Sequence, residues 1–186
     1  LLLIDAAVPI SQVDRKLASE ILKHHCPCVI LVNKWDLAEK THTQQEYAEY
    51  MDRELQGLKF APIVFTTAKD AEGIHDAVRM ALNLYQQAGH RVNTSKINRV
   101  VEQILTKYTP MSKVRKRPKV YYSTQLSVHP PTIALFVNDP SLFDSASQRY
   151  LINRFRDLLP FSEVPIKILI RGRQKMSAEE RIASRD

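Results

Sequence analysis

Glycine is scarce in this chain, whose 186 residues contain only four, at positions 57, 73, 89 and 172. Their spacing allows neither a phosphate-binding loop of the form GxxxxGK[ST] nor a dinucleotide fingerprint GxGxxG. The chain begins without methionine in an apolar strand, Leu1-Leu2-Leu3-Ile4-Asp5. We therefore expect the residues that bind nucleotide phosphates, if there are any, to lie before Leu1.

Cysteine and long apolar runs are scarce as well. Cys26 and Cys28 are too few and too close together for a disulfide framework. The run from His24 to Cys28 could suggest a metal cluster, but it fits no zinc spacing, so we expect a helix end followed by a strand and no metal. No apolar run approaches the roughly 20 residues of a membrane span. These absences favour a cytoplasmic protein with no membrane partner.

Hydrophobic residues make up 44% of the chain and charged residues 25%, which suits one large or two small globular domains. The charge is unevenly divided. Residues 1–89 carry 9 Lys and Arg against 12 Asp and Glu, a net charge of −3, whereas residues 90–186 carry 18 against 8, a net charge of +10. This change predicts one domain at 1–89, a second at 90–173 and a charged, disordered tail at 174–186.

The first domain alternates strand and helix patterns, which indicates parallel strands joined by helices. Apolar runs predict strands at 1–5, 28–33 and 63–67. Two pairs with capping-box spacing, Ser11 with Asp14 and Thr43 with Glu46, predict the starts of two helices. The apolar stripes are Val13, Leu17, Ile21 and Leu22 on the first helix, Tyr47, Met51 and Leu55 on the second, and Ile74, Val78, Leu82 and Tyr85 on a third.

The second predicted strand ends in Asn33-Lys34-Trp35-Asp36, a pattern suited to binding guanine. The Asp36 carboxylate can accept hydrogen bonds from the ring N–H and the exocyclic amino group of guanine, which adenine does not offer together. The methylene stem of Lys34 can cover the face of the base, and the Asn33 amide can tie the loop to neighbouring backbone. The alternative is an ordinary strand-to-helix turn with a charged tip.

The third predicted strand runs into Thr67-Ala68-Lys69. This tripeptide resembles the Ser-Ala-Lys loop of translation-factor-like GTPases, with Thr67 in place of serine. The resemblance implies that the backbone N–H of Ala68 approaches the guanine carbonyl oxygen. Taken alone, the tripeptide is also compatible with a plain strand-to-helix loop.

The second half reads as α-β-β-α-β, typical of an α+β domain. An apolar stripe from Ile97 to Tyr108 predicts its first helix, which Pro110 ends. Strands are predicted at 120–128, 132–138 and 164–171, and a second helix at 145–159. Alternation in the first of these strands places Val120, Tyr122, Thr124, Leu126 and Val128 on its apolar face.

A cluster of cations precedes that strand, namely Lys113, Arg115, Lys116, Arg117 and Lys119. Together with the net charge of the second half, it predicts contact with RNA. Tyr121, on the side of the strand opposite to the predicted apolar face, is the candidate for base stacking. The alternatives are a solvated loop and a docking surface for the acidic first half.

The succession of these two halves resembles the C-terminal part of the bacterial double GTPases of the Der (EngA) family. The similar strings are Asn33–Leu37, Thr67–Lys69, Lys119–Gln125, Pro130–Thr132, Leu135–Pro140 and Tyr150-Leu151. The resemblance implies an α/β, doubly wound partial P-loop GTPase half-domain over residues 1–89, followed by an α+β KH-like domain.

The resemblance further implies a protein with two consecutive GTPase domains that acts in late assembly of the large ribosomal subunit. Its cofactors would be GTP or GDP with Mg²⁺, the latter held by residues absent from this chain. Its partners would be the large ribosomal subunit and ribosomal RNA, with intramolecular contacts to the GTPase domains and no DNA. We expect this chain alone to be inactive.

The chain also has no GXXG loop, with which KH domains ordinarily clamp RNA backbone. Another surface would therefore contact RNA, or the domain would chiefly contact protein. The alternative function is a non-catalytic adaptor.

Overall fold

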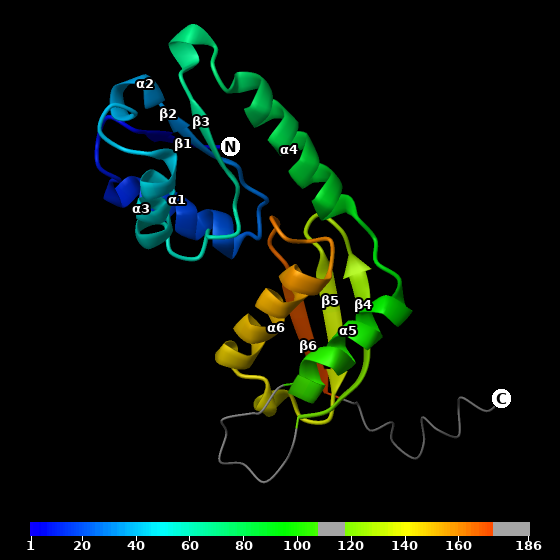
Figure 1. Ribbon diagram of the computed structural model, residues 1–186. Coiled ribbons are helices and arrows are strands. Elements are labelled where there is room, and N and C mark those ends of the chain that lie inside the picture. Colours follow the sequence, from blue (N-terminus) through cyan, green and yellow to red (C-terminus); the bar gives the residue numbers. More distant parts are fainter. Residues whose placement is uncertain (108–117, 173–186) are drawn as a thin grey trace, which may run out of the picture.

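The computed structural model describes residues 1–107 and 118–172, which form two units, each built on a three-stranded sheet (Figure 1). The first unit comprises β1 (Leu2–Asp5), α1 (Gln12–Lys23), β2 (Ile30–Asn33), α2 (Trp35–Ala38), α3 (Gln44–Glu54), β3 (Ile63–Thr66), the 3₁₀ helix η1 (Ala68–Asp70) and α4 (Ile74–Gly89). The second comprises α5 (Thr94–Lys107), β4 (Val120–Ser127), β5 (Thr132–Val137), the 3₁₀ helix η2 (Pro140–Leu142), α6 (Ser145–Leu158) and β6 (Lys167–Gly172).

The first sheet has the order β1-β2-β3 with all strands parallel, as the alternation of strands and helices predicted. Its strands are short apolar runs, and Val32 in the middle strand is fully buried. Asp5, Asn33 and Thr66 are neighbours in register at the carboxyl ends of the three strands. These ends are where open α/β sheets collect ligands.

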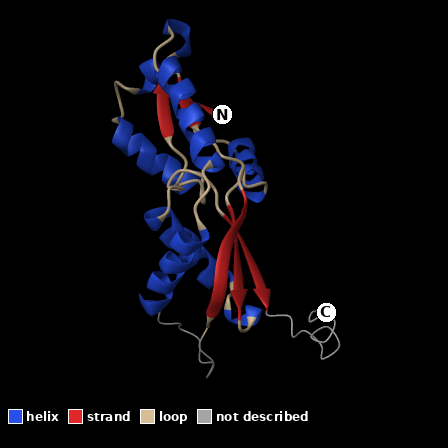
Figure 2. Cartoon of the chain, turned by 90° about the vertical axis from the view of Figure 1, so that its right-hand side faces the viewer, coloured by secondary structure: helices blue, strands red, loops and turns tan. Residues whose placement is uncertain are grey.

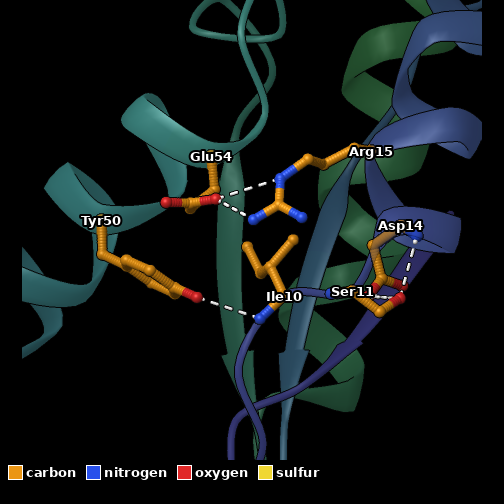
Figure 3. A network of polar contacts seen from close by, with 6 residues as sticks. All are labelled: Ile10, Ser11, Asp14, Arg15, Tyr50 and Glu54. Carbon is orange, nitrogen blue, oxygen red and sulfur yellow. Dashed lines mark hydrogen bonds and ion pairs between the residues drawn. The ribbon is translucent and has the colours of Figure 1, made fainter.

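Polar contacts join α3 to α1 and to the loop that precedes α1 (Figure 3). The backbone N–H of Ile10 donates to the Tyr50 hydroxyl at 2.9 Å, and the Arg15 guanidinium Nε lies 3.1 Å from a Glu54 carboxylate oxygen. The predicted capping boxes at Ser11 and Thr43 are both confirmed, since each hydroxyl accepts from a backbone N–H three residues on. The starts of both helices are therefore local properties of the sequence.

The apolar stripe predicted on α1 is wrong at its first two positions. Val13 and Leu17 are 66% and 48% exposed, and Ala18, at 2%, is the buried residue of the helix. Ile21 and Leu22 are partly buried against the core. An amphipathic pattern shows that a helix has an apolar side, but it does not show what covers that side.

The apolar face predicted on α4 is likewise exposed. Val78, Leu82 and Tyr85 are 55%, 60% and 67% exposed. The buried residues of the helix are instead Ala77, Leu84 and Ala88. On α3, in contrast, the predicted residues Tyr47, Met51 and Leu55 are all buried.

The second unit follows the predicted order α-β-β-α-β, with β5 antiparallel to β4 and parallel to β6. Figure 2 shows its two long helices on one side of the sheet. The core between them includes Ile97 and Ile104 of α5, Leu135 of β5 and Phe155 of α6, all at most 2% exposed. The fold expected for this half is therefore the fold observed.

The prediction of which side of β4 is apolar is wrong. Ser123 and Gln125 are buried, at 0% and 4% exposure, whereas Tyr122 and Leu126 are 45% and 42% exposed. The pairing of β4 with β5 is irregular between Val120 and Tyr122 and again between Gln125 and Ser127. A β-bulge inserts one residue and reverses the faces beyond it, so strict alternation from Val120 fails.

Side chains from both units meet at their junction. The Gln87 amide of α4 donates to the Glu163 carboxylate at 2.6 Å and accepts the Glu163 backbone N–H at 3.2 Å. The Arg156 guanidinium of α6 lies 4.2 Å from the centre of the Phe60 ring. One apolar cluster continues from Leu31 across this junction into the second core, so the two units pack against each other.

Candidate guanine-binding site

Two loops leave neighbouring strands at the carboxyl edge of the first sheet, one after β2 and one after β3. The predicted residues Asn33, Lys34 and Asp36 lie on the first loop and at the start of α2, and Thr67 to Lys69 form the second. Parallel pairing of β2 with β3 puts Asn33 opposite Thr66, so residues more than 30 positions apart become neighbours. The fold therefore brings both predicted segments into one place.

The Asn33 side chain ties these two loops together. Its Oδ1 accepts the backbone N–H of Ala68 at 3.0 Å and lies 3.4 Å from the Thr66 hydroxyl. This contact agrees with the tethering geometry expected for the Asn33 amide. It also occupies the Ala68 N–H, so that group would have to be shared or released to reach a guanine carbonyl oxygen.

The loop after β3 is closed on itself. Thr67 and Glu72 exchange backbone hydrogen bonds, with N–O distances of 3.1 and 3.2 Å, so Ala68 to Asp70 project as one turn of 3₁₀ helix. Gly73 then has a φ of +72°, and a Cβ there would lie 2.3 Å from the Phe65 carbonyl oxygen. Only glycine fits that close approach, which makes Gly73 a structural part of the loop.

Asp36 and Lys69 form an ion pair across the two loops. The Lys69 Nζ lies 2.6 Å from the Asp36 Oδ2, and the side chain of Asp36 is 22% exposed. The hydrogen bond to Asp36 and the negative charge of that carboxylate raise the pKa of Lys69 above its usual range. A base that hydrogen-bonds to Asp36 must displace Lys69 from it or share it. Lys69 is largely exposed, and ion pairs at such sites contribute little, so a base can compete with this one.

Lys34 is held by Asp5, a residue that the sequence analysis missed. Lys34 has a left-handed backbone conformation, with φ of 59°, and its Nζ lies 2.6 Å from the Asp5 Oδ2. The other Asp5 oxygen accepts the backbone N–H of Ala7 at 2.9 Å. The hydrogen bond with Lys34 and the Ala7 N–H lower the pKa of Asp5. A signal was present in the sequence, because Asp5 is the first polar residue after an apolar strand.

Trp35 anchors the first loop. It is 8% exposed, and its ring makes edge contacts with Phe65 at 4.4 Å and Tyr47 at 5.6 Å between centroids. Because Trp35 is buried between Lys34 and Asp36, the two polar side chains are directed away from the core. The burial of Trp35 therefore fixes the position from which the two polar side chains extend.

A cavity of about 620 Å³ lies beside this edge, but it contains none of the predicted guanine-binding residues. Its lining includes Val8, His42 and Tyr50. The site is therefore assigned from the convergent polar groups of the two loops.

Of the predicted RNA-binding residues, the structure places only two. Lys119 is exposed just before β4, and its Nζ lies 5.4 Å from the centre of the Tyr121 ring, which is itself 49% exposed. The other four lie outside the described residues, namely Lys113, Arg115, Lys116 and Arg117.

No group of three or more metal-ligating side chains occurs within residues 1–107 and 118–172. In the same part of the chain, no helix is both long and apolar enough to cross a membrane.

Comparison with known proteins places the chain in a family. A profile described as the KH-domain-like, C-terminal region of EngA bacterial GTPase enzymes matches residues 91–171. Three proteins named GTPase Der are similar to this chain over nearly its whole length. They come from Rhodopirellula baltica, Gloeobacter violaceus and Trichlorobacter lovleyi, and they are 36%, 39% and 38% identical to this chain over 96%, 95% and 97% of its residues. The chain belongs to the Der (EngA) family.

The membership of the Der (EngA) family that the motifs predicted is thereby confirmed. The matches span only 39% to 40% of the Der relatives, so the chain corresponds to less than half of their length. Within the chain, the profile match begins at residue 91, two residues after α4 ends. The match includes β4, β5 and all of β6 except its last residue, Gly172.

Proposed function

We propose that this chain acts as part of a GTPase that binds GTP and GDP and works in late assembly of the large ribosomal subunit, with ribosomal RNA as a partner. The relatives' name, GTPase Der, supports the nucleotide and the reaction. The observation that carries the proposal is the Asp36 carboxylate, held at the sheet edge beside the loop that Asn33 ties down. Phosphates and Mg²⁺ would be bound by residues outside this chain.

In this proposal, guanine replaces Lys69 as the hydrogen-bond partner of Asp36. The two carboxylate oxygens accept from the ring N–H and the amino group, and the stem of Lys34, held at its end by Asp5, covers the base. Discrimination against adenine follows because adenine would leave a desolvated carboxylate without donors. A site built on hydrogen bonds of this kind can discriminate by roughly ten-thousand-fold.

Substitution of Asp36 tests the proposal in the full-length protein. Asp36→Asn removes the acceptor for two charge-assisted bonds worth roughly 1.5–3 kcal/mol each, so GDP affinity should fall at least about tenfold. Affinity for xanthosine diphosphate should rise, because its C2 carbonyl accepts from the new amide. Asp76→Asn, an exposed aspartate on α4, is the control and should change neither affinity. Calorimetry that shows unchanged GDP affinity in Asp36→Asn would exclude Asp36 from the site.

The second candidate is a non-catalytic adaptor, favoured by the lack of any glycine-rich phosphate loop in this chain. Here the first unit would serve only as a scaffold for an RNA-binding second unit. The two functions differ in the full-length protein, because an adaptor would neither exchange labelled GDP nor release phosphate from GTP.

A further inference from the structure

The sheet of the second unit has two faces of different character. Pairing of β4 with β5 places Ser123 opposite Leu135, on the side that α5 and α6 cover, and Tyr122 opposite Phe136, on the other side. Parallel pairing of β5 with β6 continues the second row from Phe136 to Arg171. Tyr122, Phe136 and Arg171 therefore form one row across three strands.

Within residues 1–107 and 118–172, neither α5 nor α6 covers the face that carries this row. Figure 2 shows both long helices of that unit on the opposite side of the sheet. Tyr122, Phe136 and Leu169 belong to neither apolar core cluster, whereas Leu135 and Ile170, which point the other way, do. Tyr122 is 45% exposed.

Aromatic rings lie together on this open face. The centroids of Tyr122 and Phe136 are 5.9 Å apart, with 40° between the ring planes. A half-exposed tyrosine supported by a second ring is a surface on which an unpaired nucleobase can stack, whatever its sequence. Single-stranded RNA presents such bases, whereas the bases of a duplex are already stacked.

The charge on this sheet is of one sign. None of the three strands contains Asp or Glu, and β6 carries exposed Lys167 and Arg171 near its two ends. Lys167 and Arg171 are four residues apart in a strand that rises about 3.3 Å per residue, so their Cα atoms lie roughly 13 Å apart. Lys119 adds a third exposed cation just before β4. Cations on both sides of an aromatic pair, with no carboxylate among them, favour an anionic polymer over an apolar protein surface.

We propose that the open face of the β4-β5-β6 sheet binds single-stranded RNA, with a base stacked on Tyr122 and Phe136 and with Lys167 and Arg171 contacting phosphates. The inference rests on the RNA partner of the proposed function and names its surface. It assigns stacking to Tyr122 in place of Tyr121, because the bulge in β4 turns Tyr122 to the face opposite to α5 and α6.

Binding of a fluorescein-labelled 12-nucleotide single-stranded RNA to the full 186-residue chain, measured by anisotropy, tests the stacking. Tyr122→Ala should weaken binding by about five- to 150-fold, the effect expected for one stacked base. Tyr122→Phe keeps the ring and should stay within about twofold of the unchanged chain. The control is Tyr85→Ala, which removes a tyrosine 67% exposed on α4 and should have no effect.

The salt dependence tests the cations. Replacing Lys167 and Arg171 by alanine should flatten the slope of log affinity against log salt by about 1.4, at roughly 0.7 per contact with single-stranded RNA. Lys96→Ala with Arg99→Ala is the matched control, because it removes the same charge from exposed positions on α5, on the helical side of the sheet. That control should leave the slope unchanged.

Each outcome has a definite consequence. If Tyr122→Ala binds as tightly as Tyr85→Ala and the two double variants have equal slopes, the open face does not bind RNA, and a protein surface becomes its partner. If the unchanged chain shows no RNA binding at all, the RNA partner itself is refuted. Neither result bears on guanine binding by Asp36, which the calorimetric experiment measures separately.

Discussion

Asn98 of α5 covers the outer edge of β4, and its removal should destabilise the second unit. Its Nδ2 donates to the carbonyl oxygens of Thr94 and Ser123 at 2.8 and 3.1 Å. Its Oδ1 accepts the backbone N–H and the hydroxyl of Ser123 at 2.8 and 2.9 Å. Ser123 is fully buried, so these groups have no access to water as a substitute partner.

The expected cost of Asn98→Ala follows from these contacts. Two buried donors of Ser123 lose their acceptor, at about 1–3 kcal/mol each. Alanine is the better helix former and returns about 0.6 kcal/mol. The free energy of unfolding should therefore fall by at least about 1.5 kcal/mol. With a urea dependence of about 2 kcal/mol per molar, the midpoint should fall by at least about 0.7 M.

Urea unfolding followed by far-UV circular dichroism measures this effect. Trp35, the one tryptophan of the chain, lies in the first unit, so its fluorescence follows that unit separately. Asn153→Ala, the same substitution at an exposed position on α6, is the control and should change the free energy by less than about 0.5 kcal/mol. In a double-mutant cycle with Ser123→Ala, the two losses should be less than additive, because the hydroxyl then needs no acceptor. Equal midpoints for Asn98→Ala and Asn153→Ala would refute the reasoning.

Two further predictions concern the guanine site. Gly73→Ala places a Cβ 2.3 Å from the Phe65 carbonyl oxygen at a φ of +72°. The substitution should therefore lower the free energy of unfolding by more than about 1 kcal/mol, measured by Trp35 fluorescence in urea. Unchanged stability would show that the loop can rearrange. Because Lys34 lowers the pKa of Asp5, the stability that this pair adds is fully present above the unfolded pKa of about 3.9 and is lost as pH falls through the lower folded pKa. The stability difference between the unchanged chain and Asp5→Asn should therefore shrink below about pH 4, and a constant difference in urea titrations from pH 7 to pH 3 would contradict the role of the pair.

The sequence by itself determined the local features. The capping boxes at Ser11 and Thr43 predicted two helix starts, because the capping residue and its partner are only three positions apart. The Asn33–Asp36 pattern predicted the candidate base-binding carboxylate, because a strand that ends in these residues carries its chemistry within four positions. The same pattern is part of one of the strings on which the family resemblance rests. Parallel strands in the first half followed from the alternation of element types.

Only the tertiary structure decided which groups meet. Asp5 reaches Lys34, and Lys69 reaches Asp36, through the pairing of parallel strands, which no local pattern specifies. The faces of the elements were also decided at this level. The bulge in β4 exchanged the sides of Tyr122 and Ser123, because the side-chain period of a strand is two and one inserted residue reverses it. Val13 and Val78 kept their helical periodicity but are exposed, because periodicity fixes which residues share a side, and only packing fixes what that side touches.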